Sequence, residues 1–140
     1  MALKPTSISE IKKIVATCLA GFAEVKAAFL FGSYARGRQN EHSDIDIAVL
    51  GSGINTLRLS SRLSEALSSP VDVVTLDSVG FLLMRTIVQQ GKLVYCSDRP
   101  ALACWLSRAY SQIETDSPLF RRMHEGYLRR VAAKGILHDA

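Results

Sequence analysis

Two acidic residues, Asp44 and Asp46, stand at the start of the apolar segment "DIDIAVLG". Because the side chains of a strand alternate between its two faces, both carboxylates are expected on one face, with Ile45 and Ile47 on the other. Neighbouring carboxylates repel each other, and each raises the pKa of the other. A divalent cation removes this conflict, and Mg²⁺ prefers one or two carboxylates together with substrate phosphates. The pattern therefore indicates a metal site. The alternative is structural, with Asp44 only beginning a strand and Asp46 pairing with an arginine, either Arg36 or Arg38.

A Gly-Ser pair follows the preceding apolar segment, "VKAAFLF". Gly32 allows the backbone to turn tightly and to approach a ligand closely. Ser33 offers a hydroxyl and an N–H at the start of a candidate short helix, "SYARG", and helix N-termini bind phosphate. Arg36 is a candidate for charge-assisted contacts to phosphate oxygens. A phosphate cradle beside an acid pair indicates a nucleoside triphosphate site. An ordinary turn with solvated arginines is the alternative.

This site differs from a P-loop, because the chain contains no Gly-Lys-Ser or Gly-Lys-Thr sequence.

The elements that must position these residues follow from the apolar periodicity. The spacing predicts a helix that begins near Ser7 and ends near Gly21, and then buried strands at 25–31 and 44–51. Further elements are expected along the rest of the chain: a helix over 55–69, a strand over 71–77, a helix over 78–91, a strand over 92–97, and helices from Asp98 onward. The fold class is thus α/β (α+β), a small mixed β-sheet of about four strands flanked by helices, with a C-terminal helical tail.

Length and composition set limits on the function. The chain has 140 residues, enough for one domain, and its 48% hydrophobic content favours a generous core or a partner surface. No apolar run approaches a membrane span and no signal peptide is evident, so a cytoplasmic protein is expected. The net charge of +4 permits a nucleotide, RNA or an acidic protein as partner without choosing among them.

The spacing between the Gly-Ser pair and the acid pair also resembles that of a known family. Gly32-Ser33, ten residues and then Asp44-Ile45-Asp46 resembles the signature of the polymerase-β-like nucleotidyltransferase superfamily. The fuller segment "GSYARGRQNEHSDIDIAVL" is similar to its minimal nucleotidyltransferases (MNT), the antitoxins of HEPN/MNT toxin–antitoxin systems. The resemblance covers residues 8–96 in element order and is most specific over residues 31–50. It implies the nucleotidyltransferase fold.

The resemblance implies a third carboxylate on a neighbouring strand, and Asp72 in "PVDVVTL" fits. Asp77 is the competitor, but it lies where the N-cap of the next helix is expected. The implied catalytic and metal-binding residues are therefore Asp44, Asp46 and Asp72, and the implied nucleotide-binding residues are Gly32, Ser33 and Arg36.

The implied activity is a Mg²⁺-dependent transfer of AMP from ATP to a hydroxyl, in the family often a tyrosine, of a cognate HEPN ribonuclease toxin. The alternatives are transfer to a small-molecule hydroxyl, such as that of an aminoglycoside, and neutralisation of a toxin by binding alone. Direct binding of nucleic acid is not expected.

The tail is expected to be involved in association. Residues 1–97 are predicted to form the nucleotidyltransferase domain, and residues 98–140 a helical extension that packs on it or on a partner. The apolar side chains predicted to contact another chain are Trp105, Leu106, Leu119 and Phe120. The resulting assembly is an oligomer or a complex with the toxin.

Overall fold

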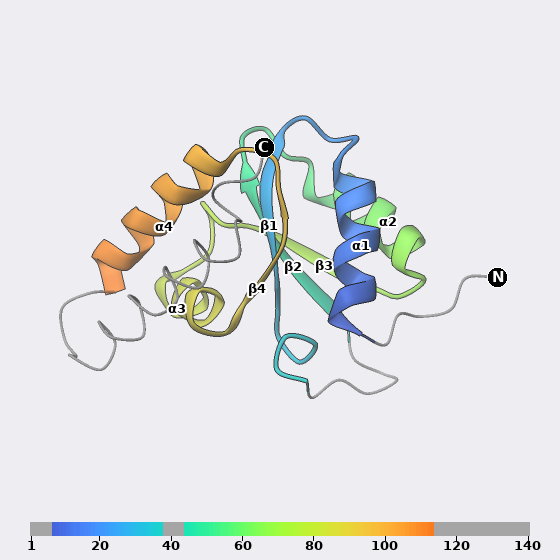
Figure 1. Cartoon of the computed structure of the whole chain (residues 1–140), viewed down its shortest axis with the longest axis horizontal. Coiled ribbons are helices and arrows are strands. Elements are labelled where there is room, and N and C mark those ends of the chain that lie inside the picture. The colour runs from blue at the N-terminus through green and yellow to red at the C-terminus, as the bar shows by residue number, and fades with distance from the viewer. Residues whose placement is uncertain (1–6, 38–43, 114–140) are drawn as a thin grey trace.

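The computed structural model describes residues 7–37 and 44–113 (Figure 1). The elements of these residues, in chain order, are α1 (Ile8–Leu19), β1 (Val25–Phe31), β2 (Ile45–Gly51), α2 (Thr56–Leu67), β3 (Val71–Thr75), α3 (Phe81–Gln90), β4 (Lys92–Cys96) and α4 (Arg99–Ile113). Their order and type confirm the sequence prediction as far as residue 113. The helix expected around Leu119 and Phe120 lies outside the described residues.

The four strands form one mixed sheet in the order β3-β2-β1-β4. β1 pairs antiparallel with both β2 and β4, whereas β2 and β3 are parallel. A parallel pair requires a crossover connection, and α2 provides it. The predicted fold class, a small mixed sheet flanked by helices, is confirmed.

Helices cover both faces of the sheet, α1 and α2 on one side and α3 and α4 on the other (Figure 1). Alternate residues of β2 follow this division. Ile45 and Ile47 are fully buried and pack in the α1/α2 layer, whereas Ala48 packs in the α3/α4 layer. Because side chains alternate along a strand, Asp46 lies on the same face as Ala48.

Side-chain caps define the starts of the two helices on the first face. The N–H of Glu10 donates to Ser7 Oγ at 3.1 Å, which confirms the expected start of α1 near Ser7. In α2, the N–H of Arg58 donates to Asn55 Oδ1 at 3.1 Å. Both caps satisfy backbone donors that the first helical turn leaves without an intrahelical partner.

The start of α3 differs from the prediction. The helix begins at Phe81, three residues later than expected, and its N-cap is Gly80, which makes no side-chain cap. Asp77 is therefore not the N-cap, and it lies exposed in the turn that follows β3. The physical reason is that the Ser78 N–H donates to the Thr75 carbonyl at 3.1 Å, and this hydrogen bond closes a turn before the helix can begin.

The partner contact predicted for Trp105 and Leu106 is wrong. Both side chains are buried in the chain's own core, where the ring of Trp105 lies 6.0 Å from that of Phe29 in β1. The apolar stripe of α4 therefore packs on the sheet. None of the helices that the structure describes is both long and apolar enough to cross a membrane. The predicted division at residues 97 and 98 stays a prediction.

Candidate active site

Strand register brings two of the predicted acids side by side. Asp46 in β2 is the direct partner of Asp72 in the parallel strand β3, and its antiparallel partner on the other side is Phe31, the last residue of β1. In-register neighbours in a sheet project from the same face. Asp46 and Asp72 therefore meet at the end of the sheet where β1 stops and where β2 and β3 begin.

Asp44 completes the group of carboxylates. It immediately precedes β2 and is exposed, as is Asp72, whereas Asp46 is half-buried between them. The burial of Ile45 and Ile47 on the opposite face confirms the alternation on which the same-face expectation rested. Asp77, the competitor of Asp72, lies beyond the other end of β3.

Two serines of α2 hold β3 in position next to Asp72. Ser60 Oγ donates to the carbonyl of Val71, and the Val71 N–H donates to Ser64 Oγ at 3.0 Å. Since β3 is an edge strand, these bonds satisfy backbone groups that no further strand pairs. The helix thus fixes the residue that precedes Asp72 and so the start of β3.

The electrostatics of the group favour a bound cation. Burial raises the pKa of Asp46, and the nearby carboxylates of Asp72 and Asp44 raise it further, while the Arg36 guanidinium opposes them. Arg36 is close enough to act on the charge of Asp46, but within the described residues the two side chains form no ion pair, so Arg36 neutralises Asp46 only in part. Arg38 lies outside the described residues. A cation beside Asp46 would remove the repulsion.

Gly32 lies directly beneath the Asp46 side chain. Its φ is +78°, in the left-handed region that glycine adopts without strain, and a Cβ at this position would overlap Asp46 Oδ2. The backbone conformation therefore favours glycine, and the observed position of the Asp46 carboxylate is possible only with glycine at this position. The Gly-Ser pair and the acid pair form one structural unit.

The segment after Gly32 is a single turn and not a regular helix. The Arg36 N–H donates to the Gly32 carbonyl at 3.2 Å, and the Gly37 N–H donates to the Tyr34 carbonyl at 3.3 Å. Tyr34 is buried and anchors the turn, whereas Ser33 is half-exposed and Arg36 is exposed. The turn leaves the Ser33 hydroxyl and the Arg36 guanidinium available to an anion.

The carboxylates fit a metal ion that substrate oxygens help to bind. Across residues 7–37 and 44–113, no three His, Cys, Asp or Glu side chains are gathered closely enough to ligate a single metal. Asp72 is nevertheless the in-register neighbour of Asp46, and the carboxylates of both Asp72 and Asp44 raise the pKa of Asp46. An all-oxygen set with one or two carboxylates for each ion, completed by phosphates, is the arrangement that Mg²⁺ prefers.

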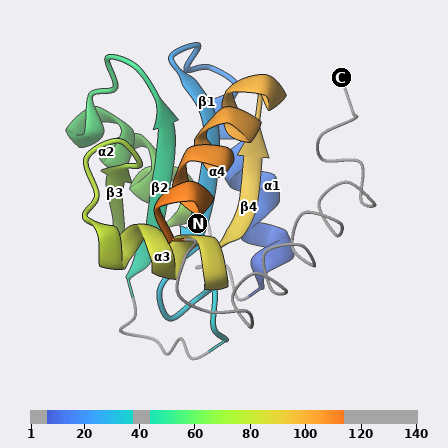
Figure 2. The same cartoon turned by 90° about the vertical axis from the view of Figure 1, so that its left-hand side faces the viewer.

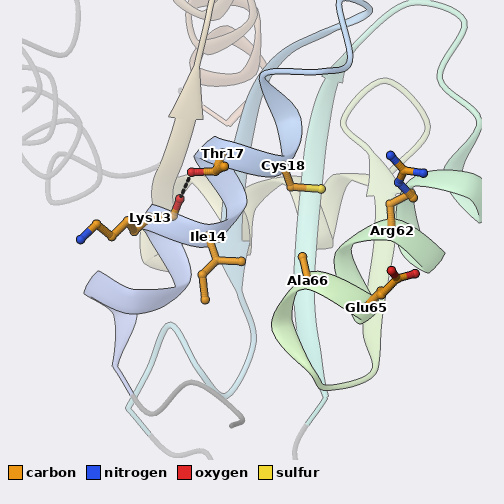
Figure 3. A pocket seen from close by; sticks show the side chains of 7 residues that line it. All are labelled: Lys13, Ile14, Thr17, Cys18, Arg62, Glu65 and Ala66. Carbon is orange, nitrogen blue, oxygen red and sulfur yellow. Dashed lines mark hydrogen bonds between the residues drawn. The ribbon is translucent and has the colours of Figure 1, made fainter. Parts of the chain in front are cut away.

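A groove on the opposite face of the sheet is separate from this site. It has a volume of about 680 Å³ and lies between α1 and α2, where Lys13, Cys18 and Arg62 are among its lining residues (Figure 3). Burial raises the pKa of the Cys18 thiol, and the Arg62 guanidinium opposes that shift. The acids lie on the α3/α4 face, so this groove is not where their chemistry occurs.

Comparison with known proteins shows the family of the chain. A model of the family described as polymerase beta, nucleotidyltransferase matches residues 11–100. Protein adenylyltransferase MntA of Shewanella oneidensis is 38% identical over 87 residues, which are 59% of this chain and 63% of MntA. The chain therefore spans less than two thirds of the length of that relative.

Two solved structures share the fold. One is a toxin–antitoxin crystal structure with AMP-PNP, which matches at a TM-score of 0.63 and 27% identity and covers 86% of this chain and 98% of the matched chain. The other is a tri-AMPylated Shewanella oneidensis HEPN toxin in complex with an MNT antitoxin, at a TM-score of 0.57 and 24% identity over 92% and 98% of the two chains. The latter likeness is one of fold alone.

Proposed function

Because the chain belongs to the polymerase beta nucleotidyltransferase family, we propose that it is a protein adenylyltransferase antitoxin. It transfers AMP from ATP to a tyrosine hydroxyl of a cognate HEPN-family ribonuclease toxin and thereby neutralises the toxin. The observation that carries this proposal is the register that sets Asp46 beside Asp72, with Gly32 packed under Asp46. Likeness to a toxin–antitoxin structure with AMP-PNP supports both the nucleotide and the kind of partner.

The transfer forms one bond and breaks one bond. The acceptor hydroxyl oxygen attacks the α-phosphorus of ATP, an O–P bond forms, and the bond to the β-phosphate breaks to release pyrophosphate. Asp72 accepts the hydroxyl proton, a role that its exposure beside Asp46 allows. Ser33 and the N–H groups of its turn orient the β- and γ-phosphates, and Arg36 adds a charge-assisted contact.

Mg²⁺ would be held by Asp44 and Asp46 together with the phosphates, all of which supply the hard oxygen ligands it prefers. Asp72 would complete a second metal position as the alternative to its role as the base. When bound, it would supply charge stabilisation at the attacked phosphate and the leaving pyrophosphate. The chain's own contribution is positional, because β2 and β3 hold two of the carboxylates in register before ATP arrives.

Substitution of Asp46 by Asn tests the proposal. Asn keeps the size of Asp but removes the negative charge, and a loss of roughly 4 kcal/mol of charge stabilisation slows transfer about 10³-fold. Asp72→Asn should act similarly, and the double variant should be little worse than either single variant, because removing one member already disables the unit. Chelation of Mg²⁺ should weaken ATP binding to the wild type.

The measurement is intact mass of the cognate HEPN-family toxin, after incubation with ATP, Mg²⁺ and each variant. Asp77→Asn is the matched control, since it makes the same chemical change at an exposed turn outside the site. Wild type and the control should add AMP, and the Asp46 and Asp72 variants should not. If Asp46→Asn still protects cells from the toxin as well as wild type does, neutralisation occurs by binding and the proposed role is wrong.

A further inference from the structure

Large apolar side chains are exposed at two places in the described part of the chain. One is Leu57, 83% exposed in the first turn of α2. The other is the start of α3, where consecutive residues Phe81 and Leu82 are 48% and 74% exposed. Because two adjacent large apolar side chains gain nothing from contact with water, the start of α3 is the stronger candidate for a contact surface.

The start of α3 lies on the same face of the sheet as the acids. Met84 and Ile87, on the other side of α3, are buried in the layer that covers the face carrying Asp46. α3 crosses this face at the end of the sheet where β1 stops and β2 begins (Figure 2). The helix whose first residues are Phe81 and Leu82 therefore lies on the face, and at the end of the sheet, that carry the acids. Leu57, in contrast, follows the far end of β2.

The side chains at this surface are typical of protein interfaces. Arg85 lies one turn after Phe81, is exposed, and forms no ion pair within the described residues. Phenylalanine and arginine are both enriched at protein interfaces relative to the rest of the surface. An exposed fraction of 74% also leaves Leu82 outside any enclosed pocket of the kind that holds a nucleotide base.

We propose that Phe81, Leu82 and Arg85 form the surface on which the acceptor protein docks. The occupant is the segment of the toxin next to its acceptor tyrosine, with apolar side chains against Phe81 and Leu82 and an acidic residue facing Arg85. The segment must lie close to the acids, because its hydroxyl has to reach the α-phosphate bound beside Asp46. This inference rests on the proposed function, since it names the place at which that partner binds.

The test compares the double variant Phe81→Ser/Leu82→Ser with the control Leu57→Ser, which removes a still more exposed apolar side chain at the other end of the sheet. The acceptor is the cognate HEPN-family toxin of the proposed function. We expect the Kd of the complex and the KM for this acceptor to rise about 30-fold, as for the loss of an interface hot spot. The kcat at saturating acceptor and the Kd for ATP should not change. Leu57→Ser should match wild type.

Charge and folding are tested separately. Arg85→Glu should also weaken the complex, whereas Arg85→Lys should retain most of the affinity. Since Phe81 is half-buried, its loss can cost stability, and Leu82→Lys alone provides a variant that leaves the helix packing intact. Circular dichroism and unfolding midpoints check that each variant is folded.

Four results would overturn the inference. The first two are an unchanged affinity for the acceptor in Leu82→Lys and an equal loss of that affinity in Leu57→Ser. The third is a parallel loss of ATP affinity in the α3 variants, which would assign the surface to the adenine. The fourth is a change in the oligomeric mass of the chain without its acceptor, which would assign the surface to a second copy. The Kd of the complex is measured in the absence of ATP, so that binding is observed without AMP transfer. If wild type transfers no AMP but the α3 variants still weaken the complex, the docking surface stands and the proposed activity fails.

Discussion

Asp46 is the residue around which the site is organised, because burial and two neighbouring carboxylates act on it at once. A pKa raised above its ordinary value means that the folded chain holds this proton more tightly than the unfolded chain does. In the absence of metal, the ionised form of Asp46 therefore opposes folding. The substitution that abolishes transfer is for this reason expected to stabilise the protein.

We accordingly expect Asp46→Asn to raise the free energy of unfolding at pH 7 in a metal-free buffer. Wild type binds more protons when folded than when unfolded between the ordinary Asp pKa, about 3.9, and the raised pKa of Asp46. The contribution of Asp46 to the free energy of unfolding of wild type therefore falls as the pH rises through that window. The extra stability of Asp46→Asn relative to wild type disappears at lower pH. Urea unfolding of both proteins from pH 3 to pH 7 measures this. A less stable variant at pH 7 would contradict it.

Gly32 and Gly37 form a matched pair for a second prediction at this scale. Both have positive φ, +78° and +70°, but an added Cβ meets Asp46 only at Gly32 and nothing within 4 Å at Gly37. Gly37→Ala should therefore cost only backbone strain, about 1 kcal/mol. Gly32→Ala should cost a similar amount of stability, because the Asp46 carboxylate can rotate away from the new methyl group.

The difference between the two variants should appear in the chemistry. Rotation of Asp46 in Gly32→Ala misplaces a carboxylate of the proposed metal site, and we expect transfer to fall about 100-fold relative to Gly37→Ala. Rates of AMP transfer and urea midpoints of both variants decide this. Equal rates would show that Gly32 serves the turn alone.

At the scale of elements, α4 is part of the core that supports the site. Its Trp105 packs against Phe29 of β1, two residues before the strand ends at the site. Trp105→Ala should destabilise the chain by about 3–5 kcal/mol, as expected for the loss of a buried aromatic side chain. Cys104→Ala, an exposed neighbour on the same helix, is the control. If Trp105→Ala left stability unchanged and only weakened a complex, the helix would be an interface element after all.

Contacts from α2 keep Asp72 in register with Asp46. The edge strand β3 contributes only five residues, and the Ser60 and Ser64 side chains of α2 bind the backbone of its first residue. A short edge strand with few ladder bonds is free to slip unless such contacts pin it. A slip of one residue would turn Asp72 to the opposite face and away from Asp46.

At the scale of the whole molecule, the two faces of the sheet differ in what they carry. One face is covered by α1 and α2, which bury a hydrophobic layer against the sheet and leave a groove between them on the outside. The other, covered by α3 and α4, carries the carboxylates at its end. Nucleotide, acceptor and the start of α3 are thus expected to meet at one end of one face.

Much of this organisation could be predicted from the sequence. The alternation around Asp44 and Asp46 indicated their shared face, since a strand has only two sides and Ile45 and Ile47 had to be buried. The spacing of the Gly-Ser pair and the acids indicated the family, and apolar runs bounded by glycine indicated the strands. These features are local, and local sequence carries them.

Only the tertiary structure decided the remaining features, because they depend on contacts between distant segments. The family resemblance named Asp72, but only the strand register shows that it is the direct neighbour of Asp46, and packing against Phe29 placed Trp105 inside the core rather than at an interface. Periodicity shows that a helix has an apolar stripe, but not whether its own sheet or a partner covers that stripe. The exposure of Phe81 and Leu82 could not be predicted for the same reason. Both occur in an apolar run, and the sequence does not show which residues of that run other elements cover.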